Sequence, residues 1–172
     1  RHAAAIDFDA FKVPALFLEA WLAELRDDRE TAADTYRSAL ELARRAGFAD
    51  HAAFALARLG ANAFASGDVR RADELERRAL AAAEEARSPW VAAHARVELG
   101  RVLAAVGELD AAERLYRQVL AWGEMPRPRE ARESLFAALA DDPAAAAAAA
   151  LSELAQTART SASGRASTRR SP

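Results

Sequence analysis

Histidine is the residue type in this chain that is best suited to acid–base or metal chemistry, and the sequence contains three, His2, His51 and His94, with no cysteine. No two histidines stand four residues apart and no glutamate stands three residues before a histidine, although these spacings place two metal ligands on one helix face. Glu98 follows His94 by one helical turn, so the two side chains could share a proton or a hydrogen bond, or form an exposed surface pair. We therefore expect no metal site.

Motifs for nucleophilic catalysis and phosphate binding are also missing from the sequence. It contains no Gly-x-Ser-x-Gly turn, no phosphate-binding glycine loop and no dinucleotide-binding fingerprint. Its seven glycines stand singly, which indicates helix crossings and turns rather than a ligand cradle. We therefore expect a protein that is not an enzyme and has no cofactor.

The elements that would position any functional residue follow a sequence repeat. Residues 88–123 read as a helix, a tight turn and a second helix, and similar landmarks occur in the same register in two earlier copies. The landmarks are Gly100, Gly107, Ala112 and Tyr116 in the third copy, Gly60, Gly67, Ala72 and Ala79 in the second, and Ala20, Asp27, Ala32 and Tyr36 in the first. In the second copy, Glu76 stands where an aromatic residue is expected. A fixed period of about 40 residues indicates stacked helical hairpins, because one hairpin cannot bury its own apolar face.

These landmarks resemble the tetratricopeptide repeat family, whose Leu-Gly pair, turn glycine, alanine and aromatic residue appear in the same order in the third copy. The resemblance covers roughly residues 10–125. It implies an all-α fold, a right-handed α-solenoid of antiparallel helical hairpins, that binds a partner. The period is longer than the family's usual length of about 34 residues. In this respect the chain is similar to the repeat arrays of bacterial ATP-binding transcriptional regulators and signalling ATPases.

Proline, glycine and composition divide the chain into four parts. We expect a lead-in over residues 1–12, three hairpins over 13–125, a degenerate fourth hairpin or capping helix over 126–158, and a disordered basic tail over 159–172. Pro14 predicts the first turn of the first helix, since a proline there gives up no helical hydrogen bond. The tail has no apolar residue larger than alanine, so it cannot bury enough surface to fold.

Charge and hydropathy exclude two kinds of partner. The formal net charge is -2, and arginines alternate with acidic residues, so we expect no direct binding to nucleic acid. No apolar run approaches the length of a membrane span, and we expect no membrane partner. The absence of cysteine is typical of a reducing compartment, so we expect a cytoplasmic protein.

The resemblance also implies where a partner would bind. In the family, ligand contacts fall on one stripe of the first helix of each hairpin, and these helices line a concave groove. The predicted groove residues are Phe17, Trp21, Glu24, Phe54, Arg58, Phe64, His94, Val97, Glu98 and Arg101. A protein or peptide partner with apolar anchors would lie there, oriented by Arg58, Glu98 and Arg101.

Several alternatives stay open at this point. The aromatic groove residues could be core, or they could form a docking face, so that the chain forms a homodimer or docks within a larger protein. The chain could also be a sensor or autoinhibitory segment of a larger ATP-dependent transcriptional regulator or signalling ATPase. One subclass of the family captures a C-terminal carboxylate with lysines and asparagines. We do not expect this chemistry here, because Lys12 lies outside the stripe and Asn62 lies one position past the asparagine site.

Overall fold

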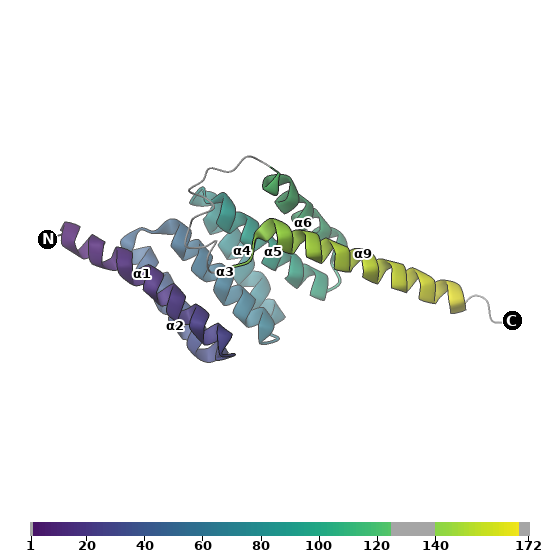
Figure 1. The fold of residues 1–172 in the computed structure, drawn as a ribbon, viewed down its shortest axis with the longest axis horizontal. Helices are drawn as coiled ribbons and strands as arrows, with labels where there is room; N and C mark the ends of the chain where they lie inside the picture. The colour runs from purple at the N-terminus through teal and green to yellow at the C-terminus, as the bar shows by residue number, and fades with distance from the viewer. Residues whose placement is uncertain (1, 125–139, 169–172) are drawn as a thin grey trace.

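The computed structural model describes residues 2–124 and 140–168, with side chains placed for residues 11–124 and 140–159. The described residues form seven helices and no strand: α1 (His2–Leu25), α2 (Arg29–Ala46), α3 (Ala49–Ala65), α4 (Val69–Glu85), α5 (Pro89–Ala105), α6 (Leu109–Gly123) and α9 (Pro143–Thr168). From α1 to α6 each helix packs against the next, and α3 also contacts α5. Figure 1 shows these helices stacked along the long axis of the molecule. The expectation of an all-α fold is confirmed.

The turns between helices are as regular as the helices. Five helices begin at positions 29, 49, 69, 89 and 109. The turn before each contains one residue with a positive φ, namely Asp27, Gly47, Gly67, Arg87 and Gly107. A left-handed residue just after a helix satisfies the last carbonyl groups and lets the chain turn into the next helix. Each sequence repeat therefore consists of two units of equal length, and each unit is a helix with its turn.

The core is formed by one face of α1, α2, α4 and α6 and by most of the surface of α3 and α5. The predicted inward face of α2 is confirmed, since Ala32, Tyr36, Ala39, Leu40 and Ala43 are all buried. Close helix crossings occur at Gly60 and Gly100. A Cβ atom at these positions would lie 2.3 Å from Glu76 Oε1 and 2.4 Å from Tyr116 Cε1, respectively. The predicted role of both glycines as crossing points is therefore confirmed.

The N-terminal part differs from the expected lead-in. α1 begins at His2, so residues 2–12 are helical and continuous with the predicted first helix. Pro14 lies inside α1 and not in its first turn. An interior proline costs a helix about 3 kcal/mol. Val13, directly before Pro14, and Phe17, three residues after it, are fully buried, and this burial offsets part of the cost.

The C-terminal part also differs from expectation. Residues 125–139, which contain the first half of the expected fourth hairpin, lie outside the described residues. The predicted restart is confirmed, since α9 begins at Pro143 and Asp142 Oδ1 accepts a hydrogen bond from the Ala144 N–H at 2.8 Å. α9 continues to Thr168, so residues 159–168, which the sequence predicts to be part of a disordered tail, are helical in the structure. A run of alanine forms helix readily, and adding further residues to an existing helix is easier than starting one.

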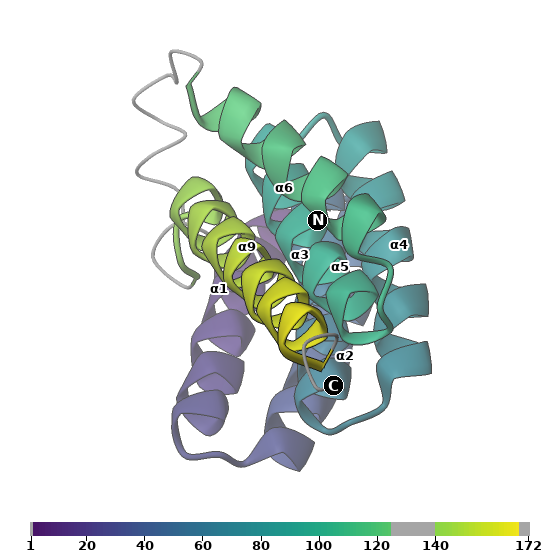
Figure 2. The ribbon, with the colours of Figure 1, turned by 90° about the vertical axis from the view of Figure 1, so that its right-hand side faces the viewer.

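α9 packs against α6 and α5, on the side of the molecule that Figure 2 turns toward the viewer. Its contact is narrow: Pro143 and Ala147 are buried, and Leu151 and Leu154 are partly buried. Gly123 at the end of α6 makes room for the start of α9, because a Cβ atom there would lie 2.7 Å from the Ala144 Cβ. Within the described residues, no helix has the length and apolar character needed to cross a membrane.

Candidate functional site

A group of three polar side chains joins α1, α2 and α3. Arg58 forms an ion pair with Glu24, and its Nε donates a hydrogen bond to the Tyr36 hydroxyl oxygen at 3.3 Å. The Tyr36 hydroxyl donates in turn to Glu24 Oε2 at 3.1 Å. Burial raises the pKa of Tyr36 to about 12, so it stays protonated at neutral pH. Arg58 and Glu24, both predicted to lie in the groove, are thus engaged in an internal contact between helices.

His94 belongs to a row of aromatic rings that crosses three helices. The Phe17 and Phe54 rings lie 5.3 Å apart, and the Phe54 and His94 rings lie 5.5 Å apart. Trp90 stacks on His94 with ring centroids 5.6 Å apart and planes at 11°. Burial lowers the pKa of His94 to about 3, and the nearby guanidinium groups of Arg58 and Arg101 act in the same direction. His94 is therefore an uncharged core residue at neutral pH. Two arrangements with Glu98 were expected, a shared hydrogen bond or an exposed pair, and neither is seen among the described residues.

Glu76 occupies the place in the second repeat that Tyr116 occupies in the third. Its carboxyl group lies against Gly60, as the Tyr116 ring lies against Gly100. Glu76 is fully buried, and neither carboxyl oxygen has a hydrogen-bond partner among the described residues. A carboxyl group thus fills a helix crossing that elsewhere in this chain holds an aromatic ring.

The charge state of Glu76 follows from its surroundings. Burial raises its pKa well above the ordinary value of 4.5, and the neighbouring carboxylate of Glu98 raises it further. Arg58 and Arg101 oppose this shift, but each is already bonded to another glutamate. An unpaired buried carboxylate is strongly disfavoured. Folding therefore favours the neutral, protonated form of Glu76 relative to the unfolded chain.

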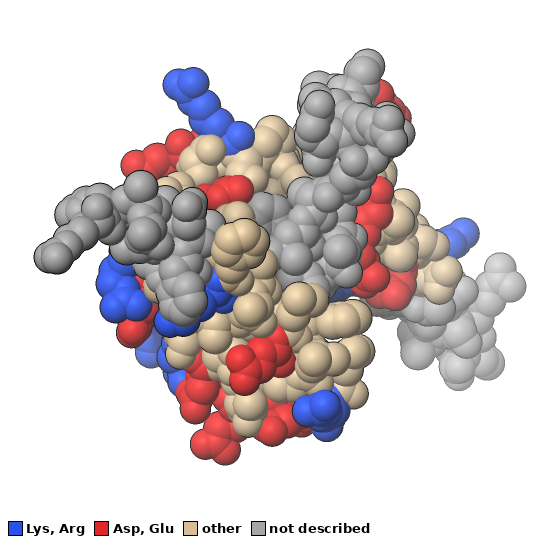
Figure 3. Space-filling model, turned by 60° about the vertical axis from the view of Figure 1, so that its left-hand side comes forward, with Lys and Arg blue, Asp and Glu red and all other residues tan. Residues whose placement is uncertain are grey.

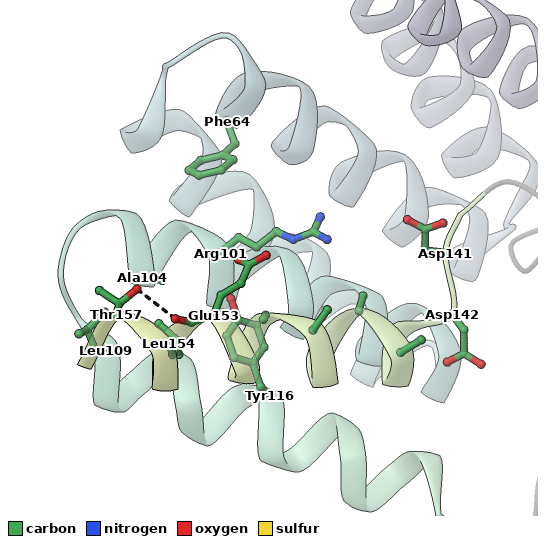
Figure 4. Close-up of a pocket in the computed structure, with 14 residues that line it drawn as sticks. Phe64, Arg101, Ala104, Leu109, Tyr116, Asp141, Asp142, Glu153, Leu154 and Thr157 are labelled. Carbon is green, nitrogen blue, oxygen red and sulfur yellow. Dashed lines mark hydrogen bonds between the residues drawn. The ribbon is translucent and has the colours of Figure 1, made fainter. Parts of the chain in front are cut away.

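Arg101 is the charged groove residue that is most exposed. Its Nη1 donates to Glu98 Oε1 at 2.8 Å, and the side chain of Arg101 is 43% exposed whereas that of Glu98 is 9% exposed. Figure 4 shows the guanidinium end of Arg101 directed into a cavity between the helices. Arg101 can therefore contact a ligand while keeping its bond to Glu98.

The cavity has a volume of about 720 Å³ and lies between α3, α5, α6 and α9. Phe64, Arg101, Ala104, Leu109 and Tyr116 form the wall on the side of the repeats, which we call the repeat wall. The α9 wall consists of Asp141, Asp142, Ala145, Ala146, Ala149, Ala150, Glu153, Leu154 and Thr157. The volume falls within the range of about 300–1,000 Å³ that is usual for ligand pockets.

The structure separates the ten predicted groove residues into three groups. Phe17, Phe54 and Val97 are fully buried, and His94 and Glu98 nearly so; Trp21, Glu24, Arg58 and Phe64 are partly buried; Arg101 is exposed. Of the ten, Phe64 and Arg101 line the cavity. Phe17 and Phe54 are core residues, as the alternative interpretation held. Their expected contact with a partner is not available, because both side chains are fully buried and their rings pack against each other.

Two features of the site were not predicted from the sequence. The burial of Glu76 had a signal, since this residue stands in the repeat register of Tyr36 and Tyr116, at a position that faces a helix crossing. The contribution of α9 to the cavity had no signal in the sequence. A run of alanines has no distinct polar and apolar faces, so the sequence does not indicate which face is buried.

A second exposed surface lies on the outer side of α1. Phe11, Leu18, Leu22 and Leu25 are 80%, 45%, 45% and 65% exposed, and their spacing places them on one helix face. Figure 3 views the molecule from the side of α1 and shows acidic and basic residues interspersed around uncharged surface. This is the surface on which the expectation of a homodimer or of docking within a larger protein now depends.

No group of three or more histidine, cysteine, aspartate or glutamate residues that could hold a metal ion occurs in the described ranges 2–124 and 140–168.

No protein-family model matches the chain, and no curated protein matches it. The described residues are all-helical with sequential helix packing, and they enclose a cavity whose walls are mainly apolar.

Proposed function

We propose that this chain is a non-catalytic scaffold that binds a segment of a protein or peptide partner in the cavity between α3, α5, α6 and α9. The observation that carries the proposal is the combination of apolar and charged groups on the repeat wall. Phe64 and Leu109 offer apolar contacts, and the half-exposed guanidinium of Arg101 points into the same space. A few polar groups that fix orientation within an apolar surface are typical of binding sites.

The same features support a particular kind of segment. Leucine or phenylalanine side chains of a partner would pack on Phe64 and Leu109, and a carboxylate would pair with Arg101. The repeat wall is built on packed helices, so little ordering of this wall would accompany binding. We therefore propose an amphipathic helix or short peptide as the ligand.

The relation to tetratricopeptide repeats is part of this proposal. We infer a right-handed solenoid of antiparallel hairpins, supported by evenly spaced helix starts and by the glycine crossings at Gly60 and Gly100. A cytoplasmic, bacterial setting goes with that resemblance. The alternative function, a sensor or autoinhibitory segment of a larger ATP-dependent regulator, is supported by the position of α9, which already covers the cavity. A nucleotide-binding motif encoded in the same gene would favour this alternative.

Selection of displayed peptides tests the proposal with no partner chosen in advance. A library of helical peptides would be selected on the full chain, and the selected peptides measured against Arg101→Glu and Phe64→Ala. Arg78→Glu is the matched control, since Arg78 is 51% exposed on α4 and does not line the cavity. We expect binding to be lost with the two cavity variants and kept with the control. Peptides that bind all of these variants equally would refute the proposal.

A further inference from the structure

α9 is seated on the repeats by a small apolar contact. Of its side chains in the described range, Pro143 and Ala147 are buried and Leu151 and Leu154 pack against the core while partly exposed. By contrast, α5 buries twelve residues, including Trp90, Val91 and Val102. The hydrophobic stabilisation of a contact grows with the apolar area that it removes from water. α9 is therefore held much less strongly than the helices of the repeats, and elements with few buried contacts open most readily.

α9 also leaves space unfilled against the repeat wall. It presents four alanines to the cavity, Ala145, Ala146, Ala149 and Ala150, and a volume of about 720 Å³ remains between them and the repeat wall. Helix interfaces elsewhere in the chain are filled by larger side chains such as Phe54, Leu56 and Val102. A helix with larger apolar side chains at the alanine positions would bury more surface in the same place.

The charges of the two walls are complementary. Among the described lining residues, Arg101 is the charged residue of the repeat wall, and the α9 wall carries Asp141, Asp142 and Glu153. Figure 4 shows Glu153 on the side of α9 that faces Arg101. The occupant favoured by the repeat wall is therefore a helix with a carboxylate at this position.

We propose that α9 is a displaceable occupant of the cavity, and that the partner is an acidic amphipathic helix whose leucine-sized side chains fill the space left by the alanines of α9. This inference rests on the proposed function and adds two points to it: the chemistry of the partner, and the replacement of α9 by the partner helix. The chain is then regulated by competition, since its own helix and the partner helix use the same repeat wall.

The first test changes how well α9 itself fills the cavity. Ala149→Leu adds a larger side chain at a position that lines the cavity, and Ala148→Leu is the matched control, because Ala148 is exposed like Ala149 but does not line the cavity. We expect Ala149→Leu to lower the equilibrium constant of unfolding roughly tenfold and Ala148→Leu to leave it nearly unchanged. Equal effects of both substitutions would overturn the inference, because α9 would then not be able to fill the cavity.

The second test uses a synthetic peptide of residues 143–159 that carries Ala145→Leu and Ala149→Leu, added to the full chain. Its control carries Glu153→Lys in addition, which places a positive charge opposite Arg101. We expect the first peptide to bind at least tenfold more tightly than the control and to speed hydrogen exchange of the amides of α9 in the full chain. Gly123→Leu, which pushes Ala144 away without touching the repeat wall, should increase the affinity, and Ala149→Leu in the full chain should reduce it.

The outcomes separate this inference from the proposed function. If the peptide binds at the repeat wall without faster hydrogen exchange in α9, then α9 is a fixed wall of the cavity. The proposed displacement of α9 is then wrong, while the scaffold function stands. If library peptides require Arg101 but this peptide does not bind, the stated partner chemistry is wrong and the scaffold function again stands. If neither kind of peptide binds through Arg101, both proposals fail.

Discussion

Replacing Glu76 by glutamine tests whether this buried carboxyl group is neutral in the folded chain. Glutamine keeps nearly the same shape against Gly60 but cannot ionise. Its effect should therefore appear in how stability changes with pH, and less in stability at any single pH. The measurement depends on one group and one helix crossing, so it is a direct probe of the local structure.

The direction of the effect follows from the shift in pKa. Folding raises the pKa of Glu76 above its ordinary value of 4.5, so the folded state keeps a proton that the unfolded state loses. This contribution to stability is fully present below about pH 4.5 and is lost as the pH rises through the folded-state pKa. Within that window, the free energy of unfolding should fall by about 1.4 kcal/mol for each pH unit.

His94 produces the opposite slope at lower pH and sets the range in which Glu76 can be measured. Burial lowers its pKa from 6.5 to about 3, so the unfolded state binds a proton that the folded state does not. Its contribution is fully present above pH 6.5 and is lost as the pH falls toward 3. The two slopes oppose each other between pH 4.5 and 6.5, and Glu76 is best observed above that range.

Urea unfolding followed by circular dichroism, between about pH 7 and about pH 8.5, provides the measurement. We expect the free energy of unfolding of the native sequence to fall with pH, and that of Glu76→Gln to stay level. Glu74→Gln is the control, because Glu74 lies on the same helix and its side chain is 70% exposed. The pH slope of its free energy of unfolding should match that of the native chain. Equal slopes for the native chain and Glu76→Gln would show that Glu76 is already ionised and would refute the neutral carboxyl group.

Three further substitutions test other parts of the structure. His94→Phe should remove the contribution of His94 to the pH slope, so that the free energy of unfolding falls less than in the native chain as the pH decreases from 6.5 toward 3, measured by the same urea titrations; a slope equal to the native one would mean that His94 is not buried as a neutral ring. Gly100→Leu should lower the free energy of unfolding by about 3 kcal/mol, because its Cβ would overlap the Tyr116 ring; an unaltered melting temperature would contradict this close crossing. Arg87→Gly should raise the free energy of unfolding by about 1 kcal/mol, since Arg87 has a φ of 53°, and a lower melting temperature would contradict the assigned turn.

The sequence predicted the local structure of the repeats well. Helix starts, turns and crossings depend on residues that are close along the chain, such as Asp68, which accepts a hydrogen bond from the Arg71 N–H at 3.1 Å, and on Gly60, Gly67 and Gly107. Errors occurred where a local signal was overridden. Pro14 normally marks a helix start, but burial of its neighbours holds it inside α1.

The candidate site was predicted less well, for a physical reason. Helical spacing tells which residues share a face, but not how deeply the neighbouring helix covers that face. Phe17 and Phe54 share the predicted stripe with Arg101, yet the first two are fully buried in a cluster of rings while Arg101 reaches the cavity.

By itself, the sequence determined a chain of helices joined by evenly spaced turns, because periodic apolar residues and turn residues act over a few positions. Tertiary structure alone decided three other properties: the protonation of Glu76, the use of His94 as a core ring, and the placement of α9 beside Arg101. Each of these depends on which residues distant in sequence come together. Burial and electrostatic energies arise from those contacts and not from the order of residues along one helix.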